Sequence, residues 1–183
     1  VDDGVGRVLN ALGEQGLYDD TLVIYTSDHG MSLGTHGFWG HGEDTWPSNT
    51  HKEANHIPLL IKPPQENLEG RVRNSLVGTT DIFSTIIDYA GLPTPSEDSM
   101  HSRSVRPLLE DDRAPWRDAV FMEQEETRSI RTEKWLLMRR YGPTSFNFQD
   151  ELYDLETDPD ERTNVVNMTE YHGVLETLSK RLD

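Results

Sequence analysis

The sequence predicts a mixed α/β fold, and three patterns along its 183 residues support this prediction. Apolar residues at helical spacing mark residues 2–15, a β-branched apolar run marks residues 21–26, and short strand-like segments at hairpin spacing follow residue 118. The length allows one domain or one and a half. We therefore expect a larger α/β region over residues 1–110, followed by a small antiparallel sheet with one helix over residues 111–183.

The first region begins with a helix and continues with two buried strands. Apolar residues occupy one face of the helix until glycines break the pattern: Val5, Val8, Leu9 and Leu12, then Gly13 and Gly16. The strand over residues 21–26 ends abruptly in polar residues that include Asp28, and ligands in open α/β sheets bind at such carboxyl ends. Residues 30–56 show no convincing period and predict a long loop, whose length suggests function. A second buried strand is expected over residues 57–61.

The rest of the chain predicts a capped helix, a connection and the small sheet. Thr80 is expected to cap a helix that stops at Gly91. Residues 92–116 are rich in proline, serine and charge, as a boundary or a surface connection is. Four strand-like segments and one helix follow: residues 119–122, 129–132, 135–140 and 151–155, with Val174, Leu175 and Leu178 on the closing helix.

The composition argues against several classes of partner and chemistry. The 33 acidic and 17 basic residues give a net charge of −16, which disfavours binding to nucleic acid or to an anionic membrane. Without cysteine, these residues form no disulfide and no zinc–thiolate site. No apolar run is long enough to span a bilayer. Because the sequence opens at Val1 without an initiator Met or a signal peptide, we expect a piece of a longer protein.

Histidine and acidic residues concentrate in the predicted loop. Five of the seven histidines lie between positions 29 and 56, as at a metal or acid/base site, although a solvated connection can have the same composition. Asp28 is the stronger candidate, since a carboxylate directly after a buried strand is held by rigid backbone.

Five motifs in order carry a resemblance to a known family. They are Tyr25-Thr26-Ser27-Asp28-His29-Gly30 with Leu33-Gly34-x-His36-Gly37-x-Trp39-Gly40; His56-Ile57-Pro58-Leu59-Leu60-Ile61; Thr80-Asp81-Ile82 through Ala90-Gly91-Leu92-Pro93; Arg103-Ser104-Val105-x-Pro107-Leu108-Leu109; and Glu151-Leu152-Tyr153-Asp154-Leu155-x-x-Asp158-Pro159-x-Glu161-x-x-Asn164. Together they resemble the later part of type I sulfatases, of the alkaline phosphatase superfamily. The resemblance implies that residues 1–110 are the C-terminal part of an alkaline-phosphatase-like α/β sandwich domain, and that residues 111–183 are its small β-sheet and helix subdomain.

The resemblance also implies a chemistry. Such enzymes hydrolyse sulfate esters with a formylglycine nucleophile, made from the Cys or Ser of a Cys/Ser-x-Pro-x-Arg motif. That motif is absent here, because Thr45-Trp46-Pro47-Ser48-Asn49 imitates its shape without the precursor residue or the arginine. Asp28 and His29 match the pair that binds Ca²⁺ or Mg²⁺, and the alternative role for His29 is to orient a neighbouring carboxylate.

The predicted substrate contacts lie further along the same loop. His41 stands where the family commonly has a lysine that holds the sulfate group, and it can hydrogen-bond sulfate or protonate the leaving oxygen. Lys52 is the alternative source of a cation. His36 is expected to line the pocket or to brace the loop, and Trp46 to stack on a sugar ring or to pack in a core. His51 completes the predicted substrate-binding set.

Three functions remain open from the sequence. The first is a sulfatase of sulfated carbohydrate or another sulfate ester, periplasmic or secreted in a bacterium by family kinship. The second is a phosphodiesterase or phosphonate monoester hydrolase of the same superfamily. The third is a non-catalytic binding fragment, because half a metal site cannot perform the chemistry alone. The substrate and the oligomeric state cannot be derived from these residues.

Overall fold

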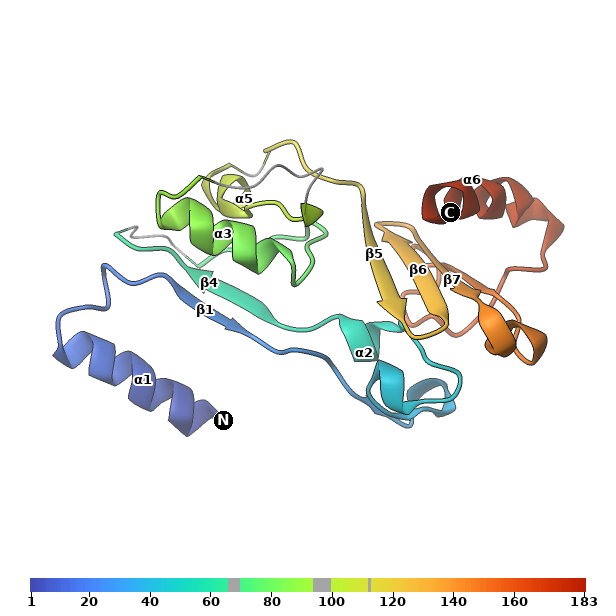
Figure 1. Ribbon diagram of the computed structural model, residues 1–183, viewed down its shortest axis with the longest axis horizontal. Coiled ribbons are helices and arrows are strands. Elements are labelled where there is room, and N and C mark those ends of the chain that lie inside the picture. The colour runs from blue at the N-terminus through green and yellow to red at the C-terminus, as the bar shows by residue number, and fades with distance from the viewer. Residues whose placement is uncertain (66–69, 94–99, 112) are drawn as a thin grey trace. The chain divides into compact units, whose positions relative to one another are not determined.

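The chain forms two compact units in a computed structural model that describes residues 1–65, 70–93, 100–111 and 113–183 (Figure 1). Unit 1 consists of Val1–Ser27, Pro58–Asn74 and Thr79–Arg113, and unit 2 of Asp28–Ile57, Ser75–Gly78 and Ala114–Asp183. The histidine-rich segment 28–57 therefore folds with the C-terminal sheet. The domain boundary near residue 110 stays a prediction for the protein as a whole.

Unit 1 contains helices and a two-stranded sheet. Its elements are α1 (Asp2–Glu14), β1 (Val23–Thr26), β4 (Leu59–Lys62), α3 (Asp81–Tyr89) and α5 (Arg106–Glu110). β1 and β4 pair antiparallel, with Thr26 opposite Leu59. The predicted helix and both strands are confirmed, but the strands are partly exposed in this chain and not fully buried as expected. Among the described residues, no helix is both long and apolar enough to cross a bilayer.

Helix α3 begins and ends at the expected places, but its start is held differently from the prediction. Thr80 makes no side-chain capping bond, because its backbone is already helical (φ −59°, ψ −30°) and not extended as a capping residue's is. The buried carboxylate of Asp81 instead accepts the N–H of Arg103 at 2.9 Å. Gly91 ends the helix with a φ of +68°, a conformation that favours glycine. Part of the predicted connection over residues 92–116, namely 94–99 and 112, lies outside the described residues.

Unit 2 is built on a four-stranded antiparallel meander. The strands β5 (Ala119–Gln124), β6 (Thr127–Thr132), β7 (Trp135–Arg140) and β8 (Glu151–Asp154) pair in sequence order. Helix α6 (His172–Leu182) closes the unit, after the short helices η3 (Gly142–Phe146) and η4 (Thr169–Tyr171). The predicted small sheet and closing helix are therefore confirmed.

The two faces of this sheet differ in chemistry. Ile130, Leu137 and Leu152 lie opposite one another on adjacent strands and pack in an apolar core with Leu178 of α6. Because side chains alternate along a strand, their neighbours form the opposite face. That face carries polar and charged residues among apolar ones: Thr127, Ser129, Arg131, Leu136, Met138, Arg140, Glu151 and Tyr153. Strand β7 is buried on both sides, as its run of apolar residues indicates.

The segment 28–57 is more ordered than the long loop predicted for it. It contains β2 (Ser32–Leu33), η1 (Thr35–Gly37), β3 (Trp39–Gly40), η2 (Gly42–Asp44) and α2 (Lys52–Asn55), with β2 and β3 paired antiparallel. Each element has two to four residues. Such elements are shorter than the window over which apolar periodicity becomes visible, so the sequence pattern could not reveal them.

We expect Leu137→Ala to destabilise the protein by about 2–5 kcal/mol, because Leu137 is fully buried at the centre of the apolar face and its loss leaves a cavity. Denaturant unfolding monitored by circular dichroism measures the change. Lys134→Ala is the control, since its ion pair with Glu156 is exposed and the expected change is within about 0.5 kcal/mol. Equal effects of the two substitutions would contradict this description of the core.

Candidate active site

Buried hydroxyl groups hold the segment 28–57 against the polar face of the sheet. Ser48 donates its Oγ hydrogen to the carbonyl of Gln124 at 2.8 Å and lies 2.9 Å from the hydroxyl of Thr127. The hydroxyl of Thr50 hydrogen-bonds the hydroxyl of Ser129, two residues further along strand β6 than Thr127. Arg140 donates to the carbonyl of Ser48. The residues that precede His51 therefore follow strand β6, and their positions are fixed by it.

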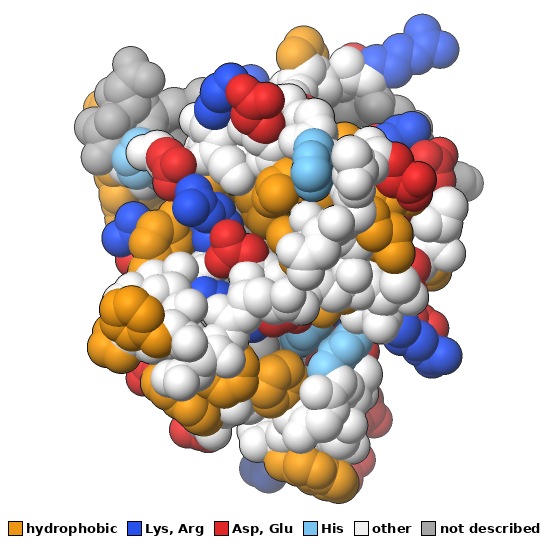
Figure 2. All heavy atoms as spheres, turned by 90° about the vertical axis from the view of Figure 1, so that its right-hand side faces the viewer, with side chains coloured by type: hydrophobic (Ala, Val, Ile, Leu, Met, Phe, Trp, Pro, Cys, Tyr) orange, Lys and Arg blue, Asp and Glu red, His pale blue; other side chains and the backbone are white. Residues whose placement is uncertain are grey.

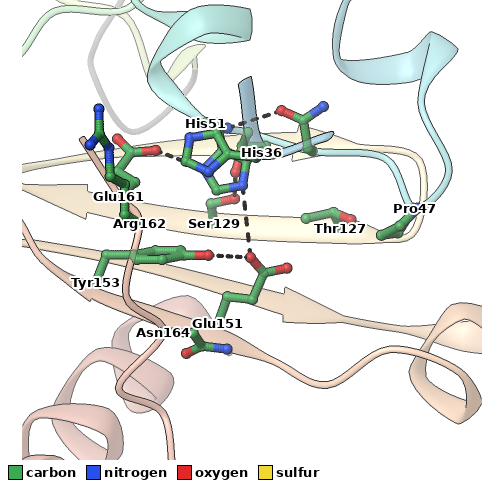
Figure 3. A network of polar contacts seen from close by, with 12 residues as sticks. His36, Pro47, His51, Thr127, Ser129, Glu151, Tyr153, Glu161, Arg162 and Asn164 are labelled. Carbon is green, nitrogen blue, oxygen red and sulfur yellow. Dashed lines mark hydrogen bonds and ion pairs between the residues drawn. The ribbon is translucent and has the colours of Figure 1, made fainter. Parts of the chain in front are cut away.

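His51 and Glu161 form the centre of the polar network (Figure 3). Nδ1 of His51 lies 2.8 Å from Oε2 of Glu161, and the two side chains are 1% and 0% exposed. The same oxygen accepts the backbone N–H of Lys52 at 3.2 Å, and Oε1 accepts a hydrogen bond from Arg131 at 2.7 Å. A carboxylate accepts and does not donate, so Nδ1 of His51 carries the proton. Both oxygens of Glu161 are thus satisfied by donors.

These donors decide the charge of Glu161. Burial would raise the pKa of this carboxyl, but the hydrogen bonds from His51 and Arg131 favour the ionised form and lower the pKa below its ordinary value. Glu161 is therefore a buried carboxylate at neutral pH.

A second carboxylate faces the other side of His51. Oε2 of Glu151 lies 3.7 Å from Nε2 of His51 and accepts a hydrogen bond from the hydroxyl of Tyr153 at 2.6 Å. Arg140 forms an ion pair with the same carboxylate. Burial and the neighbouring Glu151 raise the pKa of Tyr153, so its hydroxyl stays protonated as the donor. His51 thus lies between two acidic groups.

His36 stacks on His51 within this network. The two rings are 3.8 Å apart at an interplanar angle of 6°, and Nε2 of His36 lies 3.6 Å from Oε2 of Glu53. Burial, followed by the nearby His51, lowers the pKa of His36. These contacts are compatible with bracing the loop, one of the two roles predicted for His36, and that role stays a prediction. The substrate-binding roles of His36 and His51 stay predictions, and the burial of His51 favours a structural one.

The geometry of His36, His51 and Glu161 also resembles a metal-ligand set. One ligand atom from each lies within 4.8 Å of the others. However, both oxygens of Glu161 already accept N–H groups, and the guanidinium of Arg131 supplies the positive charge that a metal ion would bring. Within the described part of the chain Nε2 of His36 has no hydrogen-bond partner, but the carboxylate of Glu161 is fully engaged, so we interpret the cluster as a polar core.

Asp28 and His29 lie at the start of the segment, as the sequence predicted. The backbone N–H of His29 donates to Oδ1 of Asp28 at 2.9 Å, and the ring Nδ1 donates to the carbonyl of Gly30 at 2.8 Å. In the neutral ring Nε2 of His29 therefore has the lone pair, and this atom lies 3.8 Å from Oδ2 of Asp28. A carboxylate oxygen and an imidazole nitrogen at this separation suit two ligands of one divalent cation, with the remaining ligands to come from elsewhere.

His41 lies beside this pair. Its ring centroid is 4.2 Å from that of His29, and its Nε2 lies 2.8 Å from Oδ2 of Asp44. Three of the predicted site residues, Asp28, His29 and His41, are thus brought together by one segment. Asp44 is an additional member that the sequence interpretation did not assign a role.

The two remaining predicted substrate contacts, Lys52 and Trp46, interact with residues other than Asp28, His29 and His41. The ammonium of Lys52 donates to the carbonyl of Pro159 at 2.9 Å and pairs with Asp160, which offsets its charge. Trp46 is 63% exposed and meets Phe148 edge to face at 6.0 Å, so it is a surface side chain in this unit. A core position for Trp46, the alternative weighed from the sequence, is not what the structure shows. The roles of Lys52 and Trp46 toward a substrate stay predictions.

The sequence interpretation also missed Glu161, Glu151 and Arg131. Glu161 belongs to the motif Asp158-Pro159-x-Glu161-x-x-Asn164 that carried the family resemblance, and that motif was the available signal. Nothing in a single sequence indicated that it meets a histidine 110 residues earlier.

Comparison with known proteins agrees with this fold. Residues 42–183 match the family described as N-sulphoglucosamine sulphohydrolase, C-terminal. The chain is 30% identical to N-acetylglucosamine-6-O-sulfatase of Bacteroides thetaiotaomicron, over 93% of this chain and 31% of that protein. It is 29% identical to an arylsulfatase of Clostridium perfringens, over 100% of this chain and 37% of that protein.

Solved structures show that the same fold occurs in known hydrolases. One, described as a complex with its substrate D-glucosamine-2-N,6-O-disulfate, matches 100% of this chain and 37% of its own length, at 29% identity with a TM-score of 0.86. The phosphonate monoester hydrolase of Agrobacterium radiobacter matches 99% of this chain and 38% of its own, at 27% identity with a TM-score of 0.76.

The fold and the matches define the C-terminal part of a protein of the sulfatase class. The chain belongs to the sulfatase family. Its residues 42–183 correspond to the C-terminal region of that family. It spans about a third of the length of the curated relatives it matches.

We expect Glu161→Gln to flatten the acid limb of the stability profile. A carboxyl whose pKa is lowered by folding contributes stability that is fully present above its unfolded value of about 4.3 and is lost as the pH falls through the lower folded value. Unfolding free energies measured at several pH values between about 2 and 6 for both proteins test this. An equally steep acid limb in the variant would show that protonation of Glu161 does not cause the loss of stability at low pH.

Proposed function

We propose that this chain supplies half of the divalent-metal site, and part of the substrate site, of an enzyme that hydrolyses sulfate esters of carbohydrates. The observation that carries the proposal is the grouping of Asp28, His29 and His41 in one segment, with the ring of His41 4.2 Å from that of His29. The sulfatase family supports the reaction type. The nucleophile, a formylglycine by family resemblance, belongs outside these 183 residues, because its precursor motif is absent from them.

Asp28 and His29 would hold a Ca²⁺ or Mg²⁺ ion through a carboxylate oxygen and Nε2. When bound, the ion supplies positive charge beside the sulfate oxygens. The protein's own contribution is to fix the ligands: the carbonyl of Gly30 holds the proton of His29 on Nδ1, which keeps Nε2 available as a ligand atom.

His41 would contact the sulfate ester next to this ion. Hydrolysis adds water across the ester, releasing sulfate and an alcohol, and the alcohol oxygen must gain a proton as it leaves. Nε2 of His41 lies 2.8 Å from Oδ2 of Asp44. A protonated His41 can hold a sulfate oxygen by charge or give the leaving oxygen its proton, and both roles belong to the proposal.

A sulfated sugar is the proposed substrate class. Relatives at about 30% identity are named as sulfatases, one of them of N-acetylglucosamine, and one solved relative is described with a disulfated glucosamine substrate. The face shown in Figure 2 has apolar side chains among acidic and basic ones. The exposed ring of Trp46 is of the kind that stacks on sugars. A periplasmic or secreted location in a bacterium is part of the proposal and follows from kinship with bacterial sulfatases.

Phosphonate or phosphodiester hydrolysis is the second candidate. The structural match to the phosphonate monoester hydrolase favours it over a non-catalytic role. Paired assays of the full-length enzyme on 4-nitrophenyl sulfate and on a 4-nitrophenyl phosphonate ester distinguish the two, since the sulfatase proposal requires the greater kcat/KM on the sulfate.

Asp28→Ala in the full-length enzyme should lower kcat by roughly 100-fold or more and weaken divalent-metal binding, because a coordinating charge is lost. Metal content by mass spectrometry and sulfate-ester turnover measure the two effects. Asp118→Ala is the matched control: this carboxylate is similarly exposed, 79% against 86%, and pairs with Arg181. Wild-type metal content and turnover in Asp28→Ala would rule out the assignment.

Substitutions of His41 separate its two possible roles. His41→Ala should lower turnover of a sugar sulfate by about 100-fold or more, the usual range for a lost proton donor. His41→Lys should preserve turnover if the role is charge. If the role is proton donation, the same change should lower turnover of sugar sulfates and spare activated aryl sulfates, whose leaving oxygens need no proton. Unchanged rates in His41→Ala on both substrate types would exclude His41 from the site.

A further inference from the structure

Glu161 lies in the loop after β8 and binds the beginning of helix α2 from outside it. Its Oε2 accepts the side-chain N–H of His51 and the backbone N–H of Lys52, the first residue of the helix. We propose that Glu161 is a positioning residue for the metal pair Asp28 and His29, acting through α2. The inference deepens the proposed function and rests on it.

The first step of the argument is that Glu161 anchors α2. The first N–H groups of a helix have no acceptor within it, and the residue before the helix commonly supplies one. His51 occupies that position and makes no such bond. Glu161 accepts the N–H of Lys52 in its place, and Arg131 of strand β6 fixes the carboxylate from the other side. The start of α2 is therefore tied to the sheet through one buried group.

The second step is that α2 determines the position of Gly30. The N–H of Gly30 donates to the carbonyl of Ala54 at 2.8 Å, within α2. The approach is so close that a Cβ on residue 30 would collide with the carbonyl oxygen of Glu53. Only glycine permits this contact, so the backbone at residue 30 and the backbone of α2 must move together.

The third step is that Gly30 determines the ring orientation of His29 and places a proton on its Nδ1. Its carbonyl accepts the hydrogen of His29 Nδ1 at 2.8 Å, which orients the ring and leaves Nε2 to serve as the ligand. Asp28 is linked to the same residue, because its Oδ1 accepts the N–H of His29. A displacement of α2 therefore reaches both proposed ligands, although Glu161 contacts neither.

The test uses the full-length enzyme with Glu161→Gln, which keeps the shape of the side chain and removes its charge. Calorimetric titration of the metal-free protein with CaCl₂, and in parallel with MgCl₂, measures the affinity for the cation. We expect Kd to rise by about 10- to 100-fold, the usual cost of losing a group that orients a metal ligand. At saturating cation, kcat should recover more than it does in Asp28→Ala, because the ligands themselves are intact.

Glu126→Gln is the matched control. Glu126 is a partly buried carboxylate of the same unit that accepts hydrogen bonds from the backbone and the hydroxyl of Thr144, and so holds η3. It should alter unfolding without altering cation affinity. If Glu161→Gln changes Kd no more than Glu126→Gln does, Glu161 acts on stability alone and the inference is overturned.

A second variant keeps the test decisive if Glu161→Gln does not fold. Arg131→Gln leaves Glu161 in place and removes its anchor on the sheet, so Kd for the cation should rise in the same direction. An unchanged Kd in this variant would also overturn the inference. If Asp28→Ala abolishes cation binding while Glu161→Gln leaves the Kd at its wild-type value, the proposed function stands and the positioning role fails. If the wild-type enzyme binds neither cation, both fail.

Discussion

A buried carboxylate can keep its charge only where donors surround it, and the arrangement of unit 2 follows from how Glu161 meets this condition. The donors come from two places far apart in the sequence, the start of α2 and strand β6. The loop after β8 must lie where both can reach it. Together with the hydroxyl contacts of Ser48 and Thr50, the hydrogen bonds that Glu161 requires therefore hold the segment with the candidate ligands and the C-terminal sheet in one arrangement.

The two faces of the sheet contribute differently to this result. The apolar face packs α6 through side chains such as Ile130 and Leu137, and burial of that kind stabilises without fixing a unique alignment. The polar face works through paired groups, and buried ion pairs contribute little net stability once desolvation is counted. Their geometry is demanding, however. In this protein we assign the stability to one face and the alignment of segment 28–57 to the other.

The extent to which the sequence predicted this structure depends on the length of each pattern. The strands of the small sheet and helices α1, α3 and α6 repeat apolar residues over enough positions to be visible, and they lie where expected. The elements of segment 28–57 have two to four residues and produce no such pattern. The capping of α3 was predicted wrongly, because the helical backbone of Thr80 and the buried contact of Asp81 depend on tertiary structure.

The candidate site shows the same division. Asp28, His29 and His41 could be selected as candidates because family motifs and a strand end mark their positions, and the structure brings them together. Glu161 and Arg131 could not, since their role comes from contacts across 110 and 30 residues of sequence. His51 likewise lies buried between two carboxylates, and no local sequence pattern indicates this arrangement.

The tight contact between Gly30 and α2 has a consequence for building chimeras between sulfatases. Exchanging only the C-terminal part would combine the Glu161 loop of another sulfatase with the α2 of this protein. Exchanging only segment 28–57 would combine the α2 of another sulfatase with the Glu161 loop of this protein. Since the backbone of Gly30 already lies in direct contact with that of α2, neither half can adjust to a mismatched partner. Segment 28–57 and the loop that carries Glu161 therefore form one unit of recombination, although more than a hundred residues separate them in the gene.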